Sequence, residues 1–174
     1  MLKSTRFMVD AAVIAALYAA LTLALAPISF GALQIRVSEA LTILPVFTAA
    51  AIPGLTVGCL IANAAGLAMG ANIAGPWDLL FGTCATLLAA LCTYLVRKIR
   101  AKGIPVFAVL PPVILNAVVI GWELYFFAKE PLILSVAWVG LGQIAACCAI
   151  GLPLEYFMRK KGVASRLFTD YKGE

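Results

Sequence analysis

The chain contains no histidine and little charge of either sign. Asp, Glu, Lys and Arg make up 12% of its 174 residues, whereas a soluble domain carries about 25%. The lack of histidine excludes His-based catalytic triads, histidine metal sites and imidazole proton relays. No G-x-x-x-x-G-K-[ST] loop occurs either, so the chain cannot hydrolyse ATP through such a loop. We therefore expect no enzymatic activity, no bound metal and no cofactor.

The cysteines form no pattern that predicts chemistry. None belongs to a C-x-x-C pair, and all five lie in apolar segments: Cys59, Cys84, Cys92, Cys147 and Cys148. A buried free cysteine behaves as a small hydrophobic residue, so we expect these residues to have a structural role.

Long apolar runs dominate the chain. Hydrophobic residues make up 64% of it and the mean hydropathy is +1.05, which is typical of a membrane protein. A membrane span needs about 20 apolar residues, and six segments are candidates: about Phe7–Ala26, Val37–Ala51, Pro53–Gly70, Asp78–Val96, Ile104–Ala128 and Leu132–Met158. The second segment is short and contains Pro45, so we expect it to be kinked, tilted or partly re-entrant.

The basic residues gather on one side of a six-span bundle. Of 13 Lys and Arg residues, 11 precede the first segment, fill the loop after the fourth or lie in the tail, which leaves Arg36 and Lys129 opposite. The positive-inside rule then places both termini in the cytoplasm, whereas five spans would put the basic tail outside. This placement explains the +5 net charge without a nucleic-acid partner. We predict an all-α integral membrane protein, a single domain of six transmembrane helices over residues 1–174, with a basic cytoplasmic tail from about 159.

Small residues recur at every fourth position in two segments. This spacing lets helix backbones approach closely inside a bilayer, where no hydrophobic effect drives helices together. One ridge, in the third segment, suffices for internal packing: Gly54, Gly58, Ala62, Gly66 and Gly70. A second stripe, in the first segment, is a candidate docking face for another membrane subunit: Ala12, Ala16, Ala20 and Ala24.

The few polar residues near the apolar segments are the candidates for function. Ionised groups at membrane depth are costly and usually face a cavity or the bundle interior. Asn116 and Glu123 are seven residues apart, or two helical turns, so they project from nearly one face. In the six-span bundle the outer half would collect most of the others and form a cavity for a polar solute: Arg36, Glu39, Asn72, Trp77, Asp78, Tyr125 and Trp138.

Structural roles compete for several of these residues. The tryptophans also suit an interfacial belt, and Asp78 suits a helix N-terminus. Arg36 and Glu39, three residues apart, are compatible with a local ion pair. Interhelical hydrogen bonds would explain two further amides within the apolar segments, Asn63 and Gln143.

Five stretches of the chain resemble the QueT family. They are ALYAALT (16–22), PISFGALQIRVSEALT (27–42), PGLTVGCLIAN (53–63), DLLFGT (78–83) and LNAVVIG (115–121). The second is the most specific, and the resemblance runs to about residue 158. Members of this family are the queuosine-precursor substrate-binding (S) components of energy-coupling factor (ECF) transporters.

The resemblance implies a six-helix protein of the bacterial cytoplasmic membrane with an outward-facing site, capped by the loop after the first helix. S components associate with a transmembrane coupling subunit and two cytoplasmic ATPases, so ATP hydrolysis would belong to other chains. The Ala-x-x-x-Ala face that meets the coupling subunit in this family matches Ala12 and Ala16 here, and Ala20 continues the stripe.

The ligand that the resemblance implies is a 7-deazaguanine base, either queuine or a pre-queuosine base. One carboxylate could accept both N–H groups of its guanine edge, and we expect Glu123 first and Glu39 second in this role, with Asp78 as the remaining acid. Its carbonyl needs a donor and its rings an apolar wall. The candidate donors are Arg36, Asn63, Asn116 and Gln143, and the candidate walls are Trp77, Trp122, Tyr125 and Trp138.

Other functions remain open at this stage. The protein could be an S component for another vitamin or nucleobase. It could also be a stand-alone secondary transporter or channel in which Glu39 or Glu123 carries a proton, although no inverted repeat is evident. An intramembrane enzyme would have only Ser/Lys or paired-acid chemistry, and the acids belong to different segments.

Overall fold

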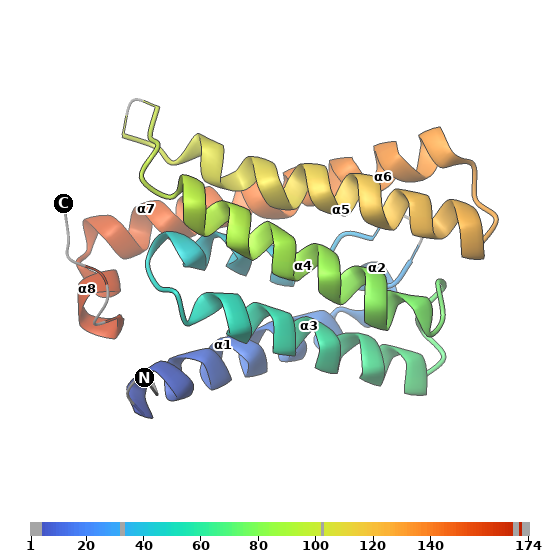
Figure 1. Ribbon diagram of the computed structural model, residues 1–174, viewed down its shortest axis with the longest axis horizontal. Helices are drawn as coiled ribbons and strands as arrows, with labels where there is room; N and C mark the ends of the chain where they lie inside the picture. The colour runs from blue at the N-terminus through green and yellow to red at the C-terminus, as the bar shows by residue number, and fades with distance from the viewer. Residues whose placement is uncertain (1–4, 32–33, 102, 169–170, 172–174) are drawn as a thin grey trace.

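The computed structural model describes residues 5–31, 34–101, 103–168 and 171. No strand occurs within these residues, and most of them are helical (Figure 1). The elements, in chain order, are α1 (Thr5–Ala24), α2 (Ala26–Ser29), the 3₁₀ helix η1 (Val37–Val46), α3 (Ala51–Ala68), α4 (Trp77–Val96), α5 (Val106–Phe127), α6 (Leu132–Ile144), the π-helical η2 (Ala145–Gly151), α7 (Leu152–Lys160) and α8 (Val163–Leu167).

Within the described residues, five helices are long and apolar enough to cross a membrane. They are α1, α3, α4, α5 and the continuous run of α6, η2 and α7 over Leu132–Lys160. The protein is therefore a multi-pass membrane protein. The predicted segments match these helices to within a few residues, apart from the second segment.

The second segment is a 3₁₀ helix in place of a full α-helical span. Its ten residues, η1, include Pro45, which has no backbone N–H to donate to an α-helical ladder. A 3₁₀ helix rises about 2 Å per residue, so η1 covers about 20 Å where an α-helix of this length would cover about 15 Å. It returns the chain from the end of the bundle where α1 finishes to the end where α3 begins (Figure 1).

The first and last described helices meet at one end of the bundle. An Arg6 Nη2 atom donates to the backbone oxygens of Arg166 and Leu167 at 3.2 and 3.0 Å. The loop between α4 and α5 lies at this end too (Figure 1). Its Arg100 pairs with the buried Glu155 of α7 at 3.0 Å, so basic groups from three parts of the chain gather there.

The small-residue ridge of α3 packs against α1. A Cβ added at Gly54 would lie 2.8 Å from the Ala11 oxygen, and one at Gly58 would lie 2.8 Å from the Ala15 oxygen. These two positions confirm the prediction of internal packing. Gly70 does not belong to the ridge, because a Cβ there would meet nothing within 4 Å.

The alanine stripe of α1 faces away from α3. Ala12, Ala16 and Ala20 are exposed, as are their neighbours Val13 and Leu17. The opposite face of α1 is buried through Ile14, Ala15, Tyr18 and Ala19. The stripe therefore lies on the outside of the bundle that the described residues form.

Candidate binding site

An ion pair between Arg36 and Asp78 lies inside the bundle. Arg36 ends the loop that follows α2, and Asp78 lies in the first turn of α4. Arg36 Nη2 donates to Asp78 Oδ2 at 2.7 Å, and both residues are buried. Since charges removed from water need a close partner, this pair fixes the loop onto α4. It replaces the local pair with Glu39 that the sequence allowed.

Two asparagines surround Asp78. Asn72 Nδ2 donates to Asp78 Oδ2 at 2.9 Å, and Asn63 Nδ2 donates to the backbone oxygen of Asp78 at 2.7 Å. The space for this arrangement comes from Gly82, one turn along α4. A Cβ at Gly82 would collide with Asp78 Oδ1 and lie 2.8 Å from Asn63 Nδ2. The stretch DLLFGT thus carries both the acid and the gap that its side chain fills.

Glu39 joins three helices through its carboxylate. The Tyr18 hydroxyl of α1 donates to Oε1, and Asn116 Nδ2 of α5 donates to Oε2 at 3.2 Å. Glu39 itself lies in the first turn of η1 and is 1% exposed. Thr42 Oγ1 donates to its backbone oxygen at 2.6 Å. Both carboxylate oxygens of Glu39 therefore already have donors within the protein.

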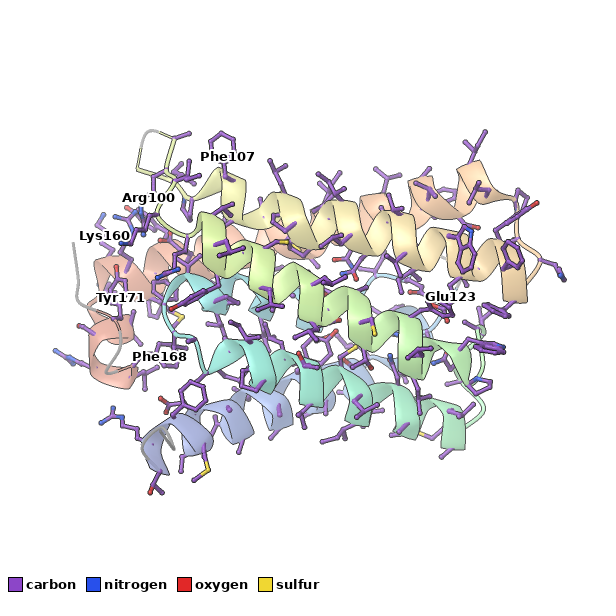
Figure 2. All side chains as sticks on the ribbon, in the orientation of Figure 1. Arg100, Phe107, Glu123, Lys160, Phe168 and Tyr171 are labelled. Carbon is purple, nitrogen blue, oxygen red and sulfur yellow. The ribbon has the colours of Figure 1, made fainter. Side chains whose placement is uncertain are left out.

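Glu123 is buried on α5 without such donors. It is 0% exposed, and neither Oε1 nor Oε2 has a hydrogen-bond partner among the described residues. It lies near enough to Asp78 and Arg36 to interact with both electrostatically. Figure 2 shows it away from the end that carries Arg100 and Lys160. A buried acidic group without a partner in a membrane-spanning helix is a candidate position for a ligand.

Acidic residues outnumber basic ones in the buried cluster. Glu39, Asp78 and Glu123 supply three carboxyl groups, and Arg36 supplies one guanidinium. Glu39 also interacts electrostatically with Arg36 and Asp78. These residues come from three separate parts of the chain, and the fold brings them close enough to interact electrostatically. Such a cluster favours a ligand that is cationic or rich in N–H groups.

The predicted tryptophans lie outside the buried cluster. Trp77 is 45% and Trp122 40% exposed, and both belong to an aromatic group that bridges α4 and α5. Trp77 stacks on Phe127 with ring centroids 4.4 Å apart, and Phe81 contacts Trp122 at 5.6 Å. Their exposure is typical of aromatic residues at the membrane–water interface.

Three other predicted residues take different positions. Gln143 is buried, and its Oε1 lies 3.8 Å from Cys147 Sγ, which in turn lies 3.6 Å from the Glu39 backbone oxygen. It therefore borders the cluster through the π-helical η2. Tyr125 and Trp138 are 46% and 40% exposed.

Sequence reasoning missed two buried residues. Tyr18 is 0% exposed, and its hydroxyl donates to Glu39. A hydroxyl in an otherwise apolar helix was the signal that could have identified it. Gln34 is 3% exposed, has a φ of 41°, and its Nε2 atom has no hydrogen-bond partner among the described residues. Both occur in stretches that carry the family resemblance.

A protein-family model described as QueT transporter matches residues 8–160. The match includes every residue of the cluster described above. No curated protein and no solved structure matches the chain. The family match covers most of the chain and agrees with its several membrane-spanning helices. The chain therefore belongs to the QueT transporter family, and its role is membrane transport.

Proposed function

We propose that the protein is the substrate-binding subunit, or S component, of an ECF-type importer of the bacterial cytoplasmic membrane. Its ligand is a 7-deazaguanine base, either queuine or a pre-queuosine base, captured from outside the cell. The observation that carries this proposal is Glu123, whose two carboxylate oxygens are buried and lack donors. Membership of the QueT transporter family supports the choice of ligand class.

The edge of the ligand matches Glu123. A guanine-type ring presents an N1–H and an exocyclic amine side by side, and a carboxylate presents two acceptor oxygens with similar spacing. Hydrogen bonds to an ionised acceptor are roughly twice as strong as neutral ones. Glu39 suits this role less well than expected from the sequence, because Tyr18 and Asn116 already donate to its two oxygens.

The carbonyl of the base needs a donor, and the structure narrows the choice. Arg36, Asn63 and Asn116 already donate to protein oxygens. Gln34 Nε2 is buried and unpaired. We therefore assign Gln34 to the carbonyl.

The six-span topology is part of the proposal. The end of the bundle that carries the basic residues Arg6, Arg100 and Arg166 faces the cytoplasm, and the half that contains Glu123 faces outward. A cysteine introduced at position 130 should therefore react with an impermeant thiol reagent added to intact cells, whereas one at position 100 should not. Labelling of position 100 from outside would contradict this orientation. A variant without the native cysteines supplies the background, because Cys84 is exposed.

The partners are a transmembrane coupling subunit and two cytoplasmic ATPases. The exposed stripe of Ala12, Ala16 and Ala20 is the docking face, because small side chains allow a second helix to approach closely. Replacing all three with leucine should abolish copurification of the ATPases from cells that express the whole transporter. The bound ligand should still copurify with the variant. Ala64→Leu, which adds the same bulk at an exposed alanine of α3, is the control and should leave assembly intact.

The same purified protein tests the identity of the ligand. Mass spectrometry of the small molecule released on denaturation should detect a 7-deazaguanine base. Detection of a different vitamin or nucleobase would contradict the proposed ligand but not the role as an S component. Transport of the base by the chain alone, without ATPases, would instead favour a stand-alone secondary transporter.

A further inference from the structure

Asp78 dictates how its two asparagines are oriented. A carboxylate oxygen and a backbone oxygen only accept hydrogen bonds, so each asparagine must present its Nδ2 atom to Asp78. The amide oxygens of Asn63 and Asn72 are then left over, and neither has a hydrogen-bond partner among the described residues. Asp78 Oδ1 is also buried and unpaired. Three acceptor oxygens therefore stand unpaired around one carboxylate.

The surroundings of these oxygens hold them together. Asn63 is 0%, Asp78 0% and Asn72 9% exposed. Asp78 Oδ1 and the Asn63 amide both approach the position that a Cβ would occupy at Gly82. An unpaired buried polar group costs about 1–3 kcal/mol, so three acceptors left unpaired together require an account. Contacts among the described residues do not explain them. The remaining polar atoms of these three side chains already have partners: Asn63 Nδ2 and Asn72 Nδ2 donate to Asp78, and Asp78 Oδ2 accepts from Arg36.

We infer that these three oxygens form a subsite for an alkylammonium group of the ligand. An ammonium group has N–H donors and no acceptor, which complements a set that contains only acceptors. Asp78 contributes a carboxylate oxygen to the set, and its ion pair with Arg36 uses the other oxygen, which favours a cation over a neutral substituent at Oδ1. The inference rests on the proposed function, since it concerns the substituent of the same ligand whose guanine edge Glu123 binds. The protein would thus select 7-deazaguanines that carry an amine.

Three probes with the same guanine edge test the subsite. They are 7-aminomethyl-, 7-hydroxymethyl- and 7-cyano-7-deazaguanine, titrated calorimetrically into the purified protein. The buffer contains choline in place of sodium, so that no sodium ion competes for the oxygens. The aminomethyl compound should bind at least tenfold more tightly than the hydroxymethyl compound, which has nearly the same size but one donor and no charge. The cyano compound, which has no donor on its substituent, should bind no better than the hydroxymethyl compound.

Matched variants locate the preference. Asn72→Ala should reduce the ratio between the aminomethyl and hydroxymethyl affinities to threefold or less. Asn116→Ala is the control, because Asn116 is also a buried asparagine but donates to Glu39. It should leave the ratio as in the wild type. The ratio is compared within each variant, so a general loss of affinity does not affect it.

Two results would overturn the subsite and leave the proposed function standing. One is equal binding of all three probes by the wild type. The other is a preference for the amine that survives Asn72→Ala and disappears in Glu123→Gln, which would place the ammonium on Glu123. If none of the three probes bound, the proposed function itself would be wrong, and the subsite with it.

Discussion

Replacing Asp78 with leucine should lower the free energy of unfolding by about 3–5 kcal/mol, which is the usual cost of removing one partner of a buried ion pair. Arg36 is 4% exposed and would keep its charge without a counter-ion. Asn72 would lose its acceptor as well. Equilibrium unfolding of the purified protein in detergent, followed by tryptophan fluorescence, measures the change.

Two variants control this measurement. The double variant Arg36→Met with Asp78→Leu should be more stable than Asp78→Leu alone, because it removes the orphaned charge together with its partner. Arg159→Met should cost no more than about 1 kcal/mol, since Arg159 is partly exposed and Glu155 keeps Arg100 as a partner. An Asp78→Leu protein as stable as the wild type would show that Arg36 reaches water or another acceptor.

The Arg36–Asp78 pair also links stability to function. It ties the loop before η1 to the start of α4, and this loop carries Gln34, the donor that we assign to the ligand carbonyl. Glu39, three residues after Arg36, is held to α1 and α5 by hydrogen bonds from Tyr18 and Asn116. The two sets of contacts position the walls of the site before any ligand arrives. Preorganisation of this kind reduces the ordering cost of binding.

Apolar length predicted the long helices well. The third predicted segment, Pro53–Gly70, corresponds to α3 at Ala51–Ala68, and the fourth, Asp78–Val96, corresponds to α4 at Trp77–Val96. Length works here because a bilayer imposes it on every crossing helix. The 3₁₀ geometry of η1 was not predictable in the same way. It depends on the distance that a ten-residue helix must cover between α1 and α3, which only the assembled bundle defines.

The sequence pointed to the polar residues that the fold buries together, but it did not predict their partners. The spacing of Arg36 and Glu39 suits an ion pair on a helix. Arg36, however, has an extended backbone with φ −88° and ψ 101°, so the helical spacing does not apply to it. Its actual partner, Asp78, is 42 residues away in the sequence. The two residues meet because the loop before η1 packs against the start of α4. Such pairs depend on tertiary structure that no local pattern encodes.

Replacing Glu123 with glutamine should weaken binding of the 7-deazaguanine ligand roughly tenfold to a hundredfold. This corresponds to about 1.5–3 kcal/mol, the contribution of a hydrogen bond to a charged group. A site built to bind a polar edge also rejects ligands that lack it, because its own buried groups are then left unpaired. Removing the exocyclic amine from the ligand should therefore cost a similar amount in the wild type and little in Glu123→Gln.

Calorimetry on the four combinations of protein and ligand decides whether Glu123 contacts the amine. Glu130→Gln is the matched control, because it makes the same chemical change outside the buried cluster and should leave both affinities within about twofold of wild type, the range of a surface substitution. Losses that interact, so that the double change costs much less than their sum, place the amine on Glu123. If the two losses add, Glu123 does not bind that edge. The assignment would then pass to Asp78, whose Oδ1 is unpaired, before Glu39, whose two oxygens are already bonded.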